Sequence, residues 1–84
     1  MNTLTERQRI CLEYLSDKME ATAVMVGRVI CVKLNDTWLS YQHVGVGALI
    51  ALEKKGLVMR LPELRAWRLT KEGREWILKQ PIEF

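Results

Sequence analysis

The chain has 84 residues, 49% of which are hydrophobic, and a formal net charge of +3. This length allows one domain with a modest core, and the apolar content excludes a disordered tail. No apolar run reaches the roughly 18–20 residues that cross a bilayer, and no apolar signal core follows the first charges. We therefore expect one domain over residues 1–84, located in the cytoplasm and without a membrane partner.

The positive charge is concentrated in the last third of the chain. Residues 1–53 hold five basic and six acidic groups, whereas residues 54–79 hold eight basic and three acidic groups. Such an asymmetry suggests that the C-terminal part meets a polyanion.

Few residues of the chain suggest metal, redox or catalytic chemistry. Cys11 and Cys31 lack a CxxC spacing, so we expect two reduced thiols in the core. His43 has no ligand partners at a suitable spacing, so no metal site and no cofactor are predicted. Asp36, Ser40 and His43 lie too close in sequence for a catalytic triad and lack an oxyanion loop. We therefore predict that the protein is not an enzyme.

The first helix is predicted to begin at Thr3 or Thr5. Each threonine has a capping-box partner three residues later, which is Glu6 or Gln8. Apolar residues then recur at spacings of three and four, a pattern that predicts one buried stripe. The predicted members of this stripe are Ile10, Cys11, Tyr14, Leu15 and, at its end, Met19.

Residues 23–34 are predicted to form a second helix with Thr22 as its cap. Strand competes with helix here, because several side chains are β-branched. Alternation of apolar and polar residues is poor, however, which favours the helix. Arg28 would project from this helix. The cluster 35–37 predicts a turn, and Trp38 follows it as a possible anchor for the loop.

A third helix is predicted from Ser40 or Tyr41 to Lys55. Gly45 and Gly47 weaken it as an isolated helix, but they allow another helix or a backbone to approach closely. Its predicted inward face consists of Val44 or Gly45, followed by Ala48, Leu49 and Leu52. Its predicted outward face consists of Tyr41, Gln42, His43, Val46, Gly47 and Ile50.

A strand–turn–strand unit is predicted after the third helix. Gly56 suits a left-handed helix end, and the β-favouring run 57–59 follows it. Pro62 lies in a reversal over residues 62–65, and a second extended run over 65–69 brings the chain back.

The chain is predicted to close with a helix that Thr70 caps and that runs to about Lys79, before Pro81. Trp67 and Trp76 are expected to pack inward, because tryptophan buries a large apolar area. The whole pattern predicts an α+β fold that is mainly α.

The element order and two strings of the sequence resemble the winged helix-turn-helix domains of MarR-like bacterial regulators. LEKKGLVMR at 52–60 resembles the end of their recognition helix with the first wing strand. WRLTKEGR at 67–74 resembles their second wing strand and the helix after it, and LTERQR at 4–9 resembles their first helix. The resemblance implies a three-helix core, a two-stranded wing and a C-terminal helix.

The same resemblance implies binding of double-stranded DNA and regulation of transcription, with the third helix in the major groove and the wing near the minor groove or backbone. Arg28 and Lys33 lie where the preceding helix would meet phosphate. Carried over by position, the predicted DNA-binding residues are Arg28, Tyr41, Gln42, His43, Arg60, Arg65, Arg68 and Lys71. A domain of this size would gain specificity as a homodimer or in a larger assembly.

The outward face of the third helix also supports a different hypothesis. Val46, Gly47 and Ile50 would form an apolar patch there, and such patches usually mark protein interfaces. The alternative function is therefore a winged-helix module for dimerisation or protein–protein interaction. Of the residues on the predicted outward face, Gln42 is the best match to a base edge.

Overall fold

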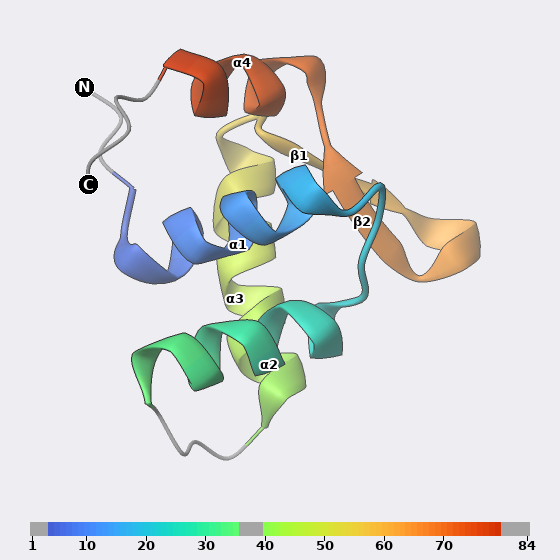
Figure 1. Ribbon diagram of the computed structural model, residues 1–84. Helices are drawn as coiled ribbons and strands as arrows, with labels where there is room; N and C mark the ends of the chain where they lie inside the picture. Colours follow the sequence, from blue (N-terminus) through green and yellow to red (C-terminus); the bar gives the residue numbers. More distant parts are fainter. Residues whose placement is uncertain (1–3, 36–39, 80–84) are drawn as a thin grey trace.

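A computed structural model of the chain describes residues 4–35 and 40–79, and it shows the mainly helical α+β fold that the sequence predicts (Figure 1). Helices α1 to α3 form the core, a β-hairpin projects from it as a wing, and α4 covers one end. This is the winged helix-turn-helix layout. The elements are α1 (Glu6–Asp17), α2 (Ala23–Leu34), α3 (Tyr41–Lys54), β1 (Val58–Leu61), a 3-10 turn (Pro62–Leu64), β2 (Ala66–Leu69) and α4 (Lys71–Lys79).

The first three helices begin at side-chain caps. At α1, the Gln8 backbone N–H donates to the Thr5 hydroxyl, and the Thr5 N–H donates to the Gln8 side chain, both over 3.2 Å. This is the capping box predicted for Thr5, whereas Thr3 lies outside the described residues. Thr22 caps α2 through the Met25 N–H at 3.3 Å.

The buried stripe of α1 differs from the prediction at three residues, of which Tyr14 is only half-buried. Ile10, Cys11 and Leu15 are buried as expected, and Leu12, which the prediction missed, is fully buried. Met19 is 80% exposed, so its placement in the stripe was wrong. The reason is that α1 ends at Asp17 and the backbone becomes extended at Lys18, which breaks the helical spacing.

Helix α2 spans the predicted residues in full, and its helical state is therefore settled. It ends at Asn35, whose left-handed backbone (φ 52°) is one that asparagine tolerates well. The predictions for residues 36–39, including Trp38, lie outside the described part of the chain.

Helices α2 and α3 cross closely. A Cβ at Gly27 would collide with the Tyr41 carbonyl, and a Cβ at Gly45 would collide with the Ala23 carbonyl.

The wing is an antiparallel pair in which Val58 faces Leu69 at the core end. Gly56 has the predicted left-handed backbone (φ 77°). The strands are shifted from the predicted runs, since β1 begins at Val58 and β2 at Ala66. Arg65, predicted both at the end of the reversal and at the start of the second strand, belongs to the reversal alone, where it closes the turn with a left-handed backbone (φ 51°).

A short bridge adds a third piece of strand beside β2. Ala21 and Trp67 exchange two backbone hydrogen bonds, with N···O distances of 3.0 and 2.8 Å. The bridge covers the free edge of β2 and fixes the foot of the wing on the segment between α1 and α2. Trp67 is buried there, as predicted, and Trp76 is half-buried.

Candidate nucleic-acid interface

The first turn of α3 presents three polar or aromatic side chains to solvent. Ser40 caps the turn by accepting a hydrogen bond from the His43 backbone N–H at 3.4 Å. Tyr41, Gln42 and His43 follow, and all three side chains are exposed. A capped turn at the end of a packed helix holds these side chains in a defined geometry, which a base-reading surface requires.

Arg28 of α2 lies beside this turn. Its neighbour Gly27 packs directly against the backbone of Tyr41, so the α2–α3 crossing brings the two elements together. The Arg28 side chain is exposed. The structure therefore groups Arg28 with the predicted residues at the start of α3.

The remaining outward residues of α3 differ from one another in exposure. Gly47 is exposed, and among the described residues no heavy atom outside its own stretch of helix lies within 4 Å of the position that a Cβ would take. Val46 is half-buried. Ile50 is also half-buried and packs against the hydrophobic core. The predicted apolar patch is thus reduced to Val46 and Gly47.

Arg60 on β1 is engaged within the protein. Its guanidinium lies 3.2 Å from a Glu53 carboxylate oxygen and 4.5 Å from the centre of the Trp67 ring. Both partners compete with any phosphate for this cation. Sequence reasoning treated Arg60 as one more wing charge, because a partner seven residues away on another element leaves no periodic signal.

Arg65 and Arg68 are exposed basic residues of the wing that have no acidic partner among the described contacts. Arg65 occupies the turn, where its N–H donates to the Pro62 carbonyl at 3.3 Å and fixes the backbone from which the side chain leaves. Arg68 stands opposite Met59 in the β1–β2 register. Besides Arg60, the wing thus carries two exposed guanidinium groups, one at its tip and one along its strand.

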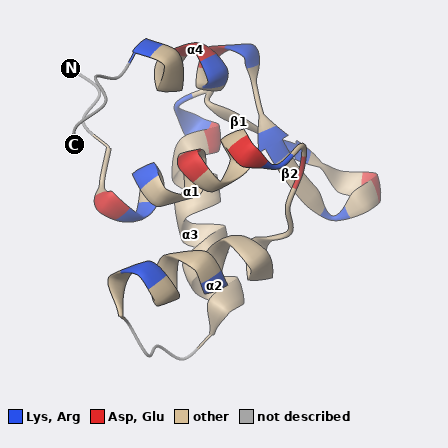
Figure 2. Cartoon of the chain, viewed as in Figure 1, with Lys and Arg blue, Asp and Glu red and all other residues tan. Residues whose placement is uncertain are grey.

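Lys71 lies at the first position of α4, directly after the wing, and it is exposed. Figure 1 shows α4 and the start of α3 at opposite ends of the molecule. The predicted residues therefore form two groups, with Arg28 and the α3 turn in one and the wing arginines with Lys71 in the other. Figure 2 shows basic and acidic residues interspersed on α4, so its charge is mixed.

Thr70 joins the wing to α4 and to the end of α3. Its hydroxyl donates to the Gly56 carbonyl at 2.7 Å and accepts from the Gly73 N–H at 3.0 Å. Its backbone N–H donates to the Leu57 carbonyl at 3.1 Å. These three bonds set the position of the basic wing relative to α3.

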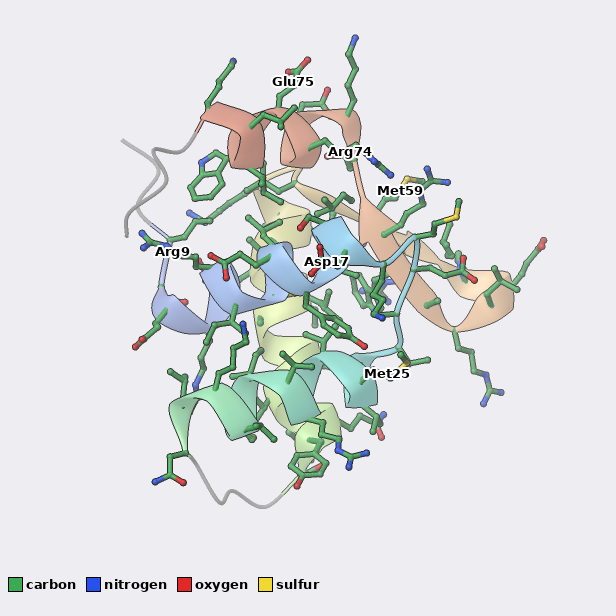
Figure 3. All side chains as sticks on the ribbon, in the orientation of Figure 1. Arg9, Asp17, Met25, Met59, Arg74 and Glu75 are labelled. Carbon is green, nitrogen blue, oxygen red and sulfur yellow. The ribbon has the colours of Figure 1, made fainter. Side chains whose placement is uncertain are left out.

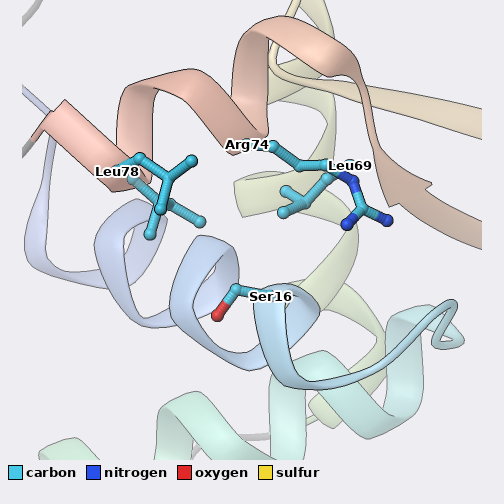
Figure 4. A pocket seen from close by; sticks show the side chains of 5 residues that line it. Ser16, Leu69, Arg74 and Leu78 are labelled. Carbon is cyan, nitrogen blue, oxygen red and sulfur yellow. The ribbon is translucent and has the colours of Figure 1, made fainter.

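A hollow of about 200 Å³ lies between α1 and α4 (Figure 4). Its walls are mainly apolar, and the Ser16 hydroxyl at its edge donates to the Glu13 carbonyl at 2.6 Å. None of the predicted site residues lies in it. The lining residues are Ser16, Leu69, Arg74, Ile77 and Leu78.

Three further features concern metal binding, thiol reactivity and membrane insertion in the described part of the chain. No group of three His, Cys, Asp or Glu residues there could hold a metal ion. The Cys11 thiol is buried, and this burial raises its pKa to about 12, so it is protonated at neutral pH. No helix among residues 4–35 and 40–79 is both long and apolar enough to cross a membrane.

No protein-family model matches this chain, and neither the curated proteins nor the solved structures that were searched give a significant match. The arrangement of the elements therefore carries the functional argument. Membership of the MarR-like regulators stays a prediction from the sequence resemblance.

Proposed function

We propose that this protein binds double-stranded DNA as a transcriptional regulator of bacterial or phage type, in the cytoplasm. The observation that carries the proposal is the exposed first turn of α3, with Arg28 beside it, on a winged-helix scaffold. In this arrangement the turn enters the major groove and Arg28 contacts a flanking phosphate. The two groups of residues at the start of α3 and on the wing contact successive parts of the duplex.

The wing supports the same proposal through its exposed charge. Arg65 and Arg68 have no acidic partner among the described contacts, unlike Arg60, which is paired with Glu53. Guanidinium groups of this kind bind phosphate oxygens and release counterions from the DNA. Lys71 extends the contact at the foot of the wing.

A second candidate function is self-association or contact with another protein through α3. Gly47 is consistent with it, because a helical glycine costs about 1 kcal/mol relative to alanine and no contact among the described residues requires its lack of a side chain. The close approach of a protein partner to α3 would explain the glycine at this position, and the close approach of DNA would explain it equally. Sedimentation of the protein without DNA separates the two, since only a protein interface gives a concentration-dependent mass.

Duplex binding tests the proposal directly. The wild-type chain is expected to raise the fluorescence anisotropy of a labelled duplex at low salt. The double variant Arg65→Gln with Arg68→Gln should bind about tenfold or more weakly, because two phosphate contacts are lost. Failure of the wild-type protein to bind any duplex at low salt would contradict the proposal.

Arg9→Gln is the matched control for a single change of charge. Figure 3 shows Arg9 at the start of α1, on the other side of the molecule from Met59 of the wing. The control should bind as tightly as the wild-type chain. If Arg9→Gln weakens binding as much as Arg68→Gln does, the wing is not a specific contact.

A further inference from the structure

We propose that α3 reads A·T base pairs, with Gln42 on adenine and Val46 on a thymine methyl group; this rests on the proposed DNA-binding function. The first ground is the absence of guanine readers. Between Tyr41 and Glu53 the helix carries no arginine and no lysine. Arginine or lysine bonded to guanine O6 and N7 is the commonest specific contact in the major groove. This helix has no such group at its exposed start.

The polar side chains that are present match adenine better than guanine. A glutamine amide donates and accepts at once, which fits the N6 donor and N7 acceptor of adenine. Gln42 is exposed and stands in the first turn of α3. The neighbouring His43 can donate to N7, which both purines present, and so it does not discriminate between them.

Val46 follows Gln42 by four residues and therefore lies on the same side of the helix. Four residues advance the helix by about 6 Å, which is close to two base-pair steps of about 3.4 Å each. Gly47, beside Val46, leaves open space where a side chain would stand. The helix can consequently lie close enough to the bases for the half-exposed valine methyl groups to touch a thymine methyl.

The wing gives an independent indication of the same preference. Arg65 stands exposed at the wing tip, in the tight turn that its own N–H closes by donating to the Pro62 carbonyl. Arginine enters narrow minor grooves, and A-tracts have the narrowest grooves and the strongest negative potential. Both contacts thus favour a site rich in A·T pairs.

Selection from a random duplex library tests the inference. The wild-type protein should enrich sites with A·T pairs at the positions that contact α3. Gln42→Ala should lose the preference at one adenine, with affinity for the wild-type site falling on the order of tenfold. Replacing the contacted thymine by deoxyuridine, which removes only the methyl group, should weaken the wild-type protein but leave Val46→Ala unaffected.

The outcomes separate this inference from the function on which it rests. Duplex binding with enrichment of G·C pairs, or with no sequence preference, would overturn the A·T inference alone. The inference also fails if Gln42→Ala selects the same sites with the same preference as the wild-type chain. No binding to any duplex at low salt would remove the DNA-binding proposal and the inference together. Thermal unfolding by circular dichroism checks that each variant is folded.

Discussion

The glycines at positions 27, 45 and 47 have the same local conformation in their helices but different surroundings. Gly27 and Gly45 lie where α2 and α3 cross, and a Cβ on either would collide with a carbonyl of the other helix. Gly47 faces open space. Gly27→Ala or Gly45→Ala should lower the free energy of unfolding by about 3 kcal/mol or more, because the helices must separate.

Gly47→Ala is the matched control, since it makes the same substitution in the same helix without a collision. It should raise the free energy of unfolding by about 1 kcal/mol through helix propensity. It should also weaken duplex binding, because the added methyl group would stand between α3 and the groove. Urea unfolding followed by circular dichroism measures the stabilities. Equal stabilities for Gly27→Ala and Gly47→Ala would show that the helices do not cross as described.

The buried Cys11 thiol should make the free energy of unfolding depend on pH in alkaline solution. Burial raises the pKa of its thiol from 9.0 to about 12, so the unfolded chain releases this proton at lower pH than the folded chain does. The stability that the buried thiol contributes is therefore fully present below pH 9 and is lost as the pH rises toward 12. The expected slope from this group is about 1.4 kcal/mol per pH unit.

Urea unfolding from pH 8 upward, for the wild-type chain and Cys11→Ala, isolates this contribution. The variant lacks the thiol but keeps the other groups that titrate in the same range. Its stability should fall less steeply with pH than that of the wild-type chain. Parallel slopes would show that the thiol is not buried in the folded protein.

Among the elements, α4 depends on a cap that is also a tertiary contact. The Thr70 hydroxyl bonds both the Gly73 N–H and the Gly56 carbonyl, whereas the Thr22 hydroxyl bonds only the Met25 N–H. Thr70→Ala should therefore cost about 2 kcal/mol and Thr22→Ala about 1 kcal/mol. Thermal unfolding should also show that Thr70→Ser, which keeps the hydroxyl, is close to the wild-type chain. Equal costs for the two alanine variants would contradict the double role of Thr70.

Helix ends were predictable from the sequence because capping is local chemistry. Thr5, Thr22 and Thr70 each cap the helix that the sequence predicts, and Ser40 caps α3. The exposed first turn of α3 was predicted from its place at the start of the helix that resembles a recognition helix. Met19 was misplaced because a periodic pattern does not show where a helix ends.

Contacts between distant elements were not predictable in this way. The bridge between Ala21 and Trp67 joins residues far apart in sequence, and no strand pattern surrounds Ala21. The pairing of Arg60 with Glu53 depends on the register of the wing against α3. The half-burial of Ile50 has the same origin, because the rest of the fold covers that part of the helix.

At the scale of the whole molecule, affinity for DNA depends on which basic residues are free to contact phosphate. Arg28, Arg65, Arg68 and Lys71 are exposed, and Arg60 is exposed too but contacts Glu53 and Trp67. Exposed basic residues on several elements give affinity that falls with salt, since each phosphate contact releases about one counterion. The net charge of +3 is too small to produce steep salt dependence without such specific contacts.

The most direct measurement is the affinity for a fixed duplex at several salt concentrations. Four phosphate contacts predict a slope of about −3 to −4 in a plot of the logarithm of the association constant against the logarithm of salt. Arg68→Gln should reduce the magnitude of this slope by about 1, and Arg60→Gln should leave it nearly unchanged. A flat salt dependence, or equal effects of the two substitutions, would contradict the proposed interface.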